Sequence, residues 1–330
     1  MNIIYLLVSL LFSGVVTFLL IKHQDKINLF SEQNHRSMHK KKIPESGGIA
    51  IFLSFIFCIF LFDTEIDMGI LGGVIFMFLV GLYDDKFGMN YKQKVFSIFI
   101  VANILYFSGF YIEHVGVFFG HEVVLNGVFA YLLLSFALVG FINAINLIDG
   151  LDGLVGVVGI IILSSFLYMG VKFGDDFLIY FAAVYICSLL GFLFFNWSPA
   201  KIFMGDNGSL MTGLIIAIVS IHAVNQHYTT LVSTMLLTAV PILDTFIIIA
   251  RRLRAGKNPF EADKQHMHHI IYEQQGKNTK KTVFVMGLMQ LLFSYMGLGF
   301  KLRDDMLIVV LFLMLFVLFY FLLNPNTKES

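Results

Sequence analysis

Long apolar segments dominate the chain and constrain its fold more than any other feature. A helix needs about 20 largely apolar residues to cross a bilayer, and such segments form helices because backbone polar groups must be paired inside lipid. Eleven candidate segments lie near residues 3–21, 47–62, 68–83, 95–111, 125–142, 153–170, 177–195, 209–224, 230–250, 282–298 and 305–323. The sequence therefore predicts an all-α polytopic membrane protein with about eleven transmembrane helices.

The overall composition agrees with a lipid environment. Hydrophobic residues make up 58% of the 330 residues and charged residues only 13%, whereas a soluble domain carries about one quarter charged residues. The formal net charge is zero, so no nucleic-acid partner is indicated. Cys58 and Cys187 lie inside apolar segments, which favours buried thiols over a disulfide framework. We expect one integral-membrane domain over residues 1–330.

The distribution of lysine and arginine predicts the orientation of the chain in the membrane. Cytoplasmic loops are enriched in these residues. If the N-terminus lies outside, all but three of the 22 basic residues fall in inner segments. The exceptions are Lys172, Lys301 and Arg303. The pattern predicts an outer N-terminus and a cytoplasmic C-terminus, with an outer loop at 112–124 that carries a little local structure.

Seven carboxylate and amide side chains lie in or beside the apolar segments, and the predicted topology brings all of them to the inner face. They are Asp84, Asp85, Asn143, Asn146, Asp149, Asp152 and Asp206. Ionisable groups at membrane depth are costly and usually functional. Oxygen ligands of this kind suit Mg²⁺, so the set indicates a metal that handles phosphates. The alternative is that these groups only join helices by hydrogen bonds or end a helix in solvent.

The spacing of four of these residues strengthens the metal interpretation. Asn143, Asn146, Asp149 and Asp152 recur every three residues, and helix neighbours at i and i+3 can share a ligand. Gly150, Gly153, Gly156 and Gly159 follow with the same spacing. Small residues there would let another helix approach closely.

The segment 196–209 places Asp206 just before an apolar segment, where backbone N–H groups of a helix N-terminus favour anions. Asp206 is thus a candidate metal ligand beside a phosphate site, or alternatively a simple helix cap. Phe203 is a candidate for stacking on a base, with interfacial packing as its alternative. Lys94 would neutralise a phosphate or, equally, anchor the chain at the inner membrane surface.

The segment 251–269 contains three histidines close together, His266, His268 and His269. Residues 260–275 could form a short helix after Pro259, near the membrane surface. A zinc site would need a further ligand that the sequence does not reveal. Beside so many carboxylates, a phosphate-binding or substrate-positioning group fits better, and ordinary surface histidines are the alternative.

Five stretches of the chain together resemble the polyprenyl-phosphate N-acetylhexosamine-1-phosphate transferase family. They are GLYDDKFG (81–88), NAINLIDGLDGL (143–154), NWSPAKIFMGDNGS (196–209), PILD (241–244) and RRLRAGKNPFEADKQHMHH (251–269). The resemblance covers residues 36–269. The asparagine of FLFFNWSPAK and the ending HMHH are closer to the branch that starts O-antigen, enterobacterial-antigen, teichoic-acid or capsule chains than to the branch that transfers phospho-muramoyl-pentapeptide.

This resemblance implies a definite reaction in a bacterial cytoplasmic membrane. Undecaprenyl phosphate attacks the β-phosphate of a UDP-N-acetylhexosamine, UMP leaves, and a lipid-linked sugar remains. The family needs Mg²⁺ or Mn²⁺ and allows a homodimer. UDP-GlcNAc is the default donor of this branch, with UDP-GalNAc or a 6-deoxy-N-acetylhexosamine as alternatives.

Matching motif positions imply roles for individual residues. Asn146 and Asp206 would hold the metal, and Asp84 and Asp85 would engage the lipid phosphate with help from Lys94. Asp149 and Asp152 would position the nucleotide, with Phe203 near the uracil. Asn143 would also bind substrate, and the histidines His266, His268 and His269 would line the diphosphate and sugar.

The first basic motif of the family is matched only in part. His39, Pro44, Gly47 and Gly48 agree with it, whereas Lys42 replaces its first proline. Ile98 stands where a glutamine often follows the lysine of the Asp-pair segment. These departures affect the details of loops rather than the expected chemistry.

Two other functions fit a membrane protein with buried acids. A cation-coupled secondary transporter should carry its site near the bilayer midplane, often within broken helices and two related halves. Here the acids lie at the inner ends of helices and no repeat is visible. A non-catalytic scaffold of the cell envelope would retain its function after replacement of Asp84 or Asp206.

Overall fold

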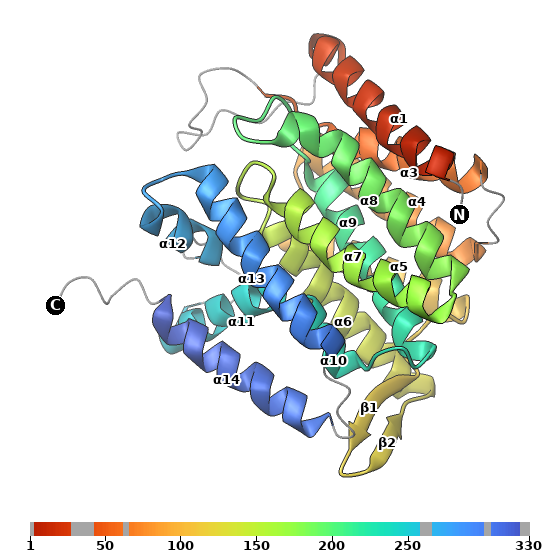
Figure 1. Cartoon of the computed structure of the whole chain (residues 1–330), viewed down its shortest axis with the longest axis vertical. Coiled ribbons are helices and arrows are strands. Elements are labelled where there is room, and N and C mark those ends of the chain that lie inside the picture. The colour runs from red at the N-terminus through yellow and green to blue at the C-terminus, as the bar shows by residue number, and fades with distance from the viewer. Residues whose placement is uncertain (1–2, 28–42, 62–65, 258–265, 300–304, 324–330) are drawn as a thin grey trace.

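The computed structural model describes residues 3–27, 43–61, 66–257, 266–299 and 305–323, which form a helical bundle with one β-hairpin at its lower end in Figure 1. The helices in the first half of the described chain are α1 (Ile3–Lys22), α2 (Gln24–Ile27), α3 (Gly47–Leu61), α4 (Met68–Phe87), α5 (Tyr91–Phe107), α6 (Gly127–Leu147) and α7 (Leu154–Phe173). They are followed by α8 (Asp176–Asn196), α9 (Asp206–Asn225), α10 (Leu231–Leu237), α11 (Ala239–Arg254), α12 (Met267–Gln274), α13 (Thr279–Gly299) and α14 (Met306–Leu322).

The described helices confirm a polytopic membrane protein. Seven of them are long and apolar enough to cross a bilayer, namely α1, α4, α6, α7, α8, α9 and α13. The bent pair α10–α11 passes the same test as one unit, and α3 and α14 are shorter apolar helices. Together with α5, these elements coincide with all eleven predicted segments.

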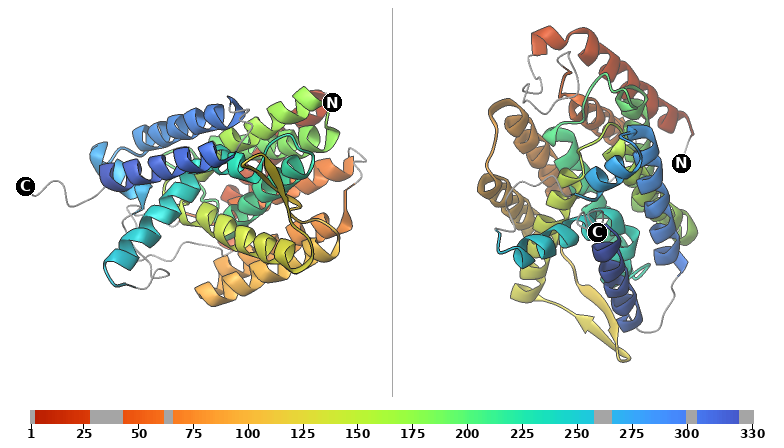
Figure 2. Two further views of the ribbon diagram at one scale, coloured as in Figure 1. Left: turned by 90° about the horizontal axis from the view of Figure 1, so that it is seen from below. Right: turned by 90° about the vertical axis from the view of Figure 1, so that its left-hand side faces the viewer.

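Helix α9 lies at the centre of the bundle, and the site depends on this placement. Its neighbours are α3, α4, α6, α7 and α8, and 89% of its apolar window is buried. By contrast, α1 and α14 lie at opposite sides of the bundle in Figure 1 and Figure 2 and expose large apolar side chains along their length. A hydrophobic outer surface of this kind is suited to lipid rather than water.

The predicted helix over 230–250 is wrong in one respect, because the chain bends by 92° between α10 and α11. Pro241 lies in the first turn of α11, lacks an N–H group, and would clash with the carbonyl of Leu237 in a continuous helix. The break leaves a backbone N–H group and a backbone carbonyl without helical partners, and Gln290 of α13 hydrogen-bonds to both. Its side chain accepts from the Val240 N–H at 3.1 Å and donates to the Leu237 oxygen at 2.7 Å.

The loop at 112–124 carries the local structure that we expected. Strands β1 (His114–Phe118) and β2 (His121–Val124) pair antiparallel, with an irregularity in the register between His114 and Gly116. The hairpin joins the end of α5 to the start of α6, so it lies at the end of the bundle away from Leu147 and Asp206.

Near the same end of the bundle, Asp175 ties α8 to α9. Its carboxylate caps α8 by accepting from the Leu178 N–H at 2.8 Å. It also lies 2.8 Å from His222 Nε2 and accepts from the Tyr228 hydroxyl at 3.1 Å. Burial on its own would raise the pKa of Asp175, but these three partners hold it below its ordinary value.

Some sequence predictions lie outside the described residues. His39 and Lys42 of the first basic motif do so, as do Lys301, Arg303 and the segment 258–265. Within the predicted helical region 260–275, residues Met267–Gln274 form α12, which confirms that part of the expectation.

Candidate active site

Three helix ends meet around the amino group of Lys94. Asp84 lies near the end of α4, Lys94 in the first turn of α5, and Asp206 at the start of α9. Lys94 Nζ is 2.5 Å from Asp84 Oδ2 and 2.7 Å from Asp206 Oδ2. The Asp84 side chain is only 5% exposed, whereas that of Asp206 is 32% exposed. One ammonium group therefore bridges two carboxylates, one buried and one accessible, which brings Asp84 and Asp206 to the same place.

Asn146 joins this group from the last turns of α6. Its Nδ2 donates to Asp206 Oδ1 at 2.6 Å and to Ser209 Oγ at 2.9 Å. The two helices approach closely because α9 presents Gly213 to α6, where a Cβ atom would lie 2.9 Å from the Ile142 Cα atom. The structure thus brings together Asp84, Lys94, Asn146 and Asp206, which the sequence had placed in four separate segments.

Asp85 closes the N-terminus of α9. Its two carboxylate oxygens accept from the backbone N–H groups of Asp206 at 2.7 Å and Asn207 at 3.0 Å, and the Asn207 side chain also donates to it. Our expectation that these N–H groups would be open to a phosphate is therefore wrong. The alternative of Asp206 as the helix cap is also wrong, because the capping position is Gly205.

A close crossing of α4 and α9 fixes the position of the aspartate pair. A Cβ atom on Gly81 would lie 2.3 Å from the Asn207 Cα atom, so only glycine allows this approach. Gly81 is one helical turn before Asp84 and Asp85. The contact therefore determines how far both carboxylates reach toward α9.

The connection between α6 and α7 carries Asp149 and Asp152 beside the same group. Burial, and then the negative charges of Asp206 and Asp85, raise the pKa of Asp149 to about 8. Asp152 accepts from the Ala200 N–H at 3.0 Å. Asn196 braces this connection by accepting from the Gly153 N–H at 2.9 Å and donating to the Ile202 oxygen at 2.8 Å. The asparagine of FLFFNWSPAK is thus a positioning residue.

The histidine motif lies against this connection and is not an ordinary surface group. His266 and His268 are buried, and His266 Nδ1 is 2.7 Å from Asp244 Oδ2. Asp244, His266 and His268 place their ligand atoms within 4.8 Å of one another. Asp244 of the PILD motif, to which we had given no role, is thus the carboxylate partner of His266, and the three side chains could hold a metal ion.

His268 points at the start of the α6–α7 connection. A Cβ atom on Gly150 would lie 2.3 Å from His268 Nε2. Within the described part of the chain neither ring nitrogen of His268 has a hydrogen-bond partner, although both are buried. Burial lowers the pKa of His268 to about 3, against the opposing effect of the Asp244 carboxylate. The neutral ring is therefore left with bonding capacity beside Asp149.

Three other predicted site residues have different surroundings. Asn143 donates to the Val139 oxygen at 2.7 Å, within its own helix. The backbone of Phe203 pairs with the Pro44 oxygen at 2.8 Å and the Gly47 N–H at 3.0 Å, which ties the motif 196–209 to the start of α3. His269 lies beside His268, with ring centroids 4.2 Å apart. Their roles in binding stay predictions.

The residues around Lys94 are suited to a divalent cation with oxygen ligands. Mg²⁺ is usually held by one or two carboxylates, with waters and phosphates filling its other positions. Asp206 and Asn146 lie side by side, and the buried Asp84 Oδ2 is paired with Lys94 Nζ. A bound divalent cation would further balance the negative charge of this buried carboxylate, which Lys94 balances among the described residues.

A helical membrane bundle with an oxygen-rich, acidic site around one lysine at one end of its helices is typical of a polytopic membrane enzyme. Residues 67–224 match the sequence model of glycosyl transferase family 4. The chain is 33% identical over 301 residues to the probable undecaprenyl-phosphate N-acetylglucosaminyl 1-phosphate transferase of Bacillus subtilis, covering 89% of this chain and 84% of that protein. The chain therefore belongs to glycosyl transferase family 4 and is a transferase.

More distant relatives agree over nearly the whole chain. The undecaprenyl-phosphate alpha-N-acetylglucosaminyl 1-phosphate transferase of Yersinia pestis is 28% identical over 324 residues, which cover 94% of this chain and 88% of that protein. The protein of the same name from Escherichia coli K12 is 28% identical over 337 residues, with coverage of 97% and 90%. The resemblance inferred from five motifs is thereby confirmed.

Proposed function

We propose that this protein transfers N-acetylglucosamine-1-phosphate from UDP-GlcNAc to undecaprenyl phosphate and so starts a lipid-linked glycan of the cell envelope. An oxygen of the lipid phosphate forms a bond to the β-phosphorus of the nucleotide sugar. The bond from that phosphorus to the bridging oxygen breaks, and UMP leaves. The observation that carries the proposal is Lys94 bridging Asp84 and Asp206 beside Asn146, at the ends of membrane helices.

The arrangement suits phosphoryl transfer because that reaction mainly needs positioning and charge stabilisation. Asp206 and Asn146 would hold Mg²⁺ or Mn²⁺, which when bound offsets the negative charge of the diphosphate. Lys94 adds a cation next to them. A phosphate monoester loses its second proton with a pKa of about 6, so the attacking oxygen requires no dedicated base. Asp84 then serves to position Lys94 and the incoming phosphate.

The location of the site explains how a lipid and a nucleotide can meet. The acceptor can keep its polyprenyl tail in the bilayer while its phosphate reaches the helix ends. We place this face in the cytoplasm and the N-terminus outside, with eleven spans. Support comes from basic residues in or just after the last turns of helices that end at this face, such as Lys86, Lys201 and Arg252.

The histidine group would contact the donor from the other side. His268 and Asp149 meet at Gly150, so a nucleotide sugar bound along the α6–α7 connection would lie between the carboxylates and the histidines. The relatives named above are N-acetylglucosaminyl 1-phosphate transferases, which makes UDP-GlcNAc the first donor to test.

The test is a UMP-release assay on purified protein with UDP-GlcNAc, undecaprenyl phosphate and Mg²⁺. We expect release that chelation abolishes and that Asp206→Asn reduces by at least about 100-fold, as for loss of a group that stabilises transition-state charge. Asp176→Asn, at the opposite end of the bundle, is the control and should retain activity. Cation-dependent uptake into vesicles without UMP release would instead establish a transporter.

A further inference from the structure

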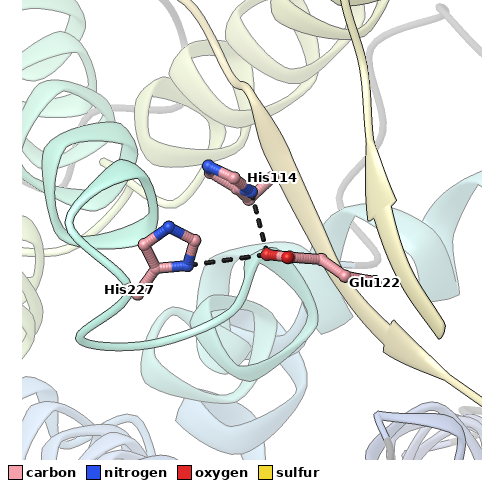
Figure 3. Close-up of side chains that lie close together, drawn as sticks. All are labelled: His114, Glu122 and His227. Atoms are coloured by element: carbon pink, nitrogen blue, oxygen red, sulfur yellow. Dashed lines mark ion pairs between the residues drawn. The ribbon is translucent and has the colours of Figure 1, made fainter. Parts of the chain in front are cut away.

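A second group of chemically versatile side chains lies at the opposite end of the bundle from the candidate active site. It consists of His114 on β1, Glu122 on β2 and His227 in the connection after α9, and Figure 3 shows the three side chains turned toward one another. Asp206 begins α9 and His227 follows its end. A helix of 20 residues is about 30 Å long, so the two groups are separate sites.

The distances within this group match those around a small metal ion. Glu122 Oε1 is 2.9 Å from His114 Nδ1 and 3.6 Å from His227 Nδ1. All three ligand atoms lie within 4.8 Å of one another. Ligand atoms about 2.0–2.2 Å from a tetrahedral zinc ion are about 3.3 Å apart. The side chains therefore need only small adjustments to share one ion.

The geometry of His114 favours a metal over a simple hydrogen bond. Its Nδ1 atom is buried and, within the part of the chain that the structure describes, makes no hydrogen bond even at 2.9 Å from a carboxylate oxygen. The nitrogen and the oxygen are close but not aligned as donor and acceptor. Misalignment of this kind is expected when both atoms point to a common third position.

The backbone around the group is held in place from several directions. The Asn225 side chain at the end of α9 donates to the Tyr111 oxygen at 2.7 Å and accepts from the Glu113 N–H at 3.1 Å. Asp305 accepts from the Val117 N–H at 2.7 Å and from the Thr230 hydroxyl at 2.6 Å. These bonds fix β1 relative to the α9–α10 connection, so His114 and His227 are brought together before any ion binds.

Two unusual features of the local backbone occur at His227 and His114. His227 has a φ of 55°, a left-handed conformation that is unfavourable for a residue with a Cβ atom. The strand register is irregular between His114 and Gly116, and such irregularities often occur beside functional sites. Unfavourable conformations that the surroundings maintain are frequently associated with function.

We propose that His114, Glu122 and His227 bind a divalent transition-metal ion of the zinc class, which fastens the β-hairpin to the connection between α9 and α10. Two imidazoles and a carboxylate form a three-ligand zinc set, with water in the fourth position. Imidazole ligands favour zinc over Mg²⁺, which prefers oxygen ligands. The ion would lie about one length of α9 from Asp206 and would take no part in transfer.

The test uses the full-length protein in detergent, freed of metal and titrated with Co²⁺, whose visible absorption reports its ligands. We expect His227→Gln and His114→Gln each to lower the number of bound ions by one, or to weaken that site at least about tenfold. His121→Gln is the matched control, because His121 is an exposed histidine of the same hairpin that lies outside the group. The comparison also separates this site from the buried group of Asp244, His266 and His268, which all of these variants retain.

Thermal unfolding provides a second measurement. Zn²⁺ should raise the midpoint of the wild type and of His121→Gln by more than that of His227→Gln, because binding to the folded state stabilises it and the variant retains only the Asp244, His266 and His268 group. If a histidine variant does not fold, Glu122→Gln serves in its place. Equal stoichiometry and equal zinc stabilisation in the wild type and the variants would overturn the proposal and identify the group as ion pairs only. UMP release by His227→Gln with Mg²⁺ should stay unchanged, since the residue lies outside the transfer site.

Discussion

The carboxylate of Asp85 accepts a hydrogen bond from the backbone N–H of Asp206 at 2.7 Å. An acid near the end of α4 thus satisfies the positive N-terminus of α9, and the same bond holds Asp206 in register with Asp84. Adjacent aspartates in GLYDDKFG therefore have different tasks. Asp84 contacts the lysine, whereas Asp85 positions the helix that carries the other acid.

We expect Asp85→Ala to destabilise the protein by about 1–3 kcal/mol, because two partly buried backbone N–H groups lose their acceptor. Activity should fall with stability. Glu273→Gln is a matched removal of an acid from an exposed pair with Lys277, and such pairs contribute little. Thermal unfolding in detergent measures the stability of both variants. Equal midpoints for the two variants would contradict the capping role.

Replacement of Lys94 should affect the reaction more than the fold. Lys94→Met leaves Asp84 and Asp206 without the ammonium that separates their charges, and we expect UMP release to fall at least about 100-fold. Lys94→Arg should recover part of the activity because the charge is retained. If Lys94→Met kept full activity, Lys94 would be an anchor at the membrane surface only.

The glycine at the crossing of α4 and α9 offers a steric test. Gly81→Ala places a methyl group 2.3 Å from the Asn207 Cα atom, and overpacking of this kind costs about 1–3 kcal/mol. Gly140→Ala in α6 is the control, since no atom lies within 4 Å of a Cβ added there. It should be neutral or slightly stabilising. Thermal unfolding of the two variants compares them directly.

The hydrogen bonds of Asp175, away from the active site, should make the folding stability sensitive to acid. The folded pKa of Asp175 is lowered, so the associated stability is present above the unfolded value of about 3.9 and is lost as the pH falls through and below it. Asp175→Asn should lower the unfolding midpoint at neutral pH. It should also reduce the steepness of the loss below about pH 4. Parallel pH profiles for the two proteins would show that Asp175 does not contribute.

Apolar length and charge placement made the helices and the acidic site predictable, because both depend on residue type and spacing along the chain. The contacts that depend on three-dimensional approach were not. Nothing in GLYDDKFG distinguishes Asp85 as a cap, and Asp244 became a partner of His266 only through the packing of α11 against the histidine segment.

The size of the bend in the backbone at Thr238 was likewise not predictable from the sequence. Pro241 lies inside the predicted segment 230–250, where a proline kinks or breaks a helix, but its presence did not predict the size of the bend, 92°. The break also depends on Gln290, fifty residues away in α13. Likewise, the approach of His227 to the hairpin depends on a left-handed φ value that its sequence neighbours do not signal.

The enclosure of α9 has a mechanical consequence. Asp206 begins the most enclosed of the seven candidate spans, and dense packing of this kind opposes displacement of the helix. Both substrates must then adapt to a stationary carboxylate, and any closing motion around them belongs to peripheral segments.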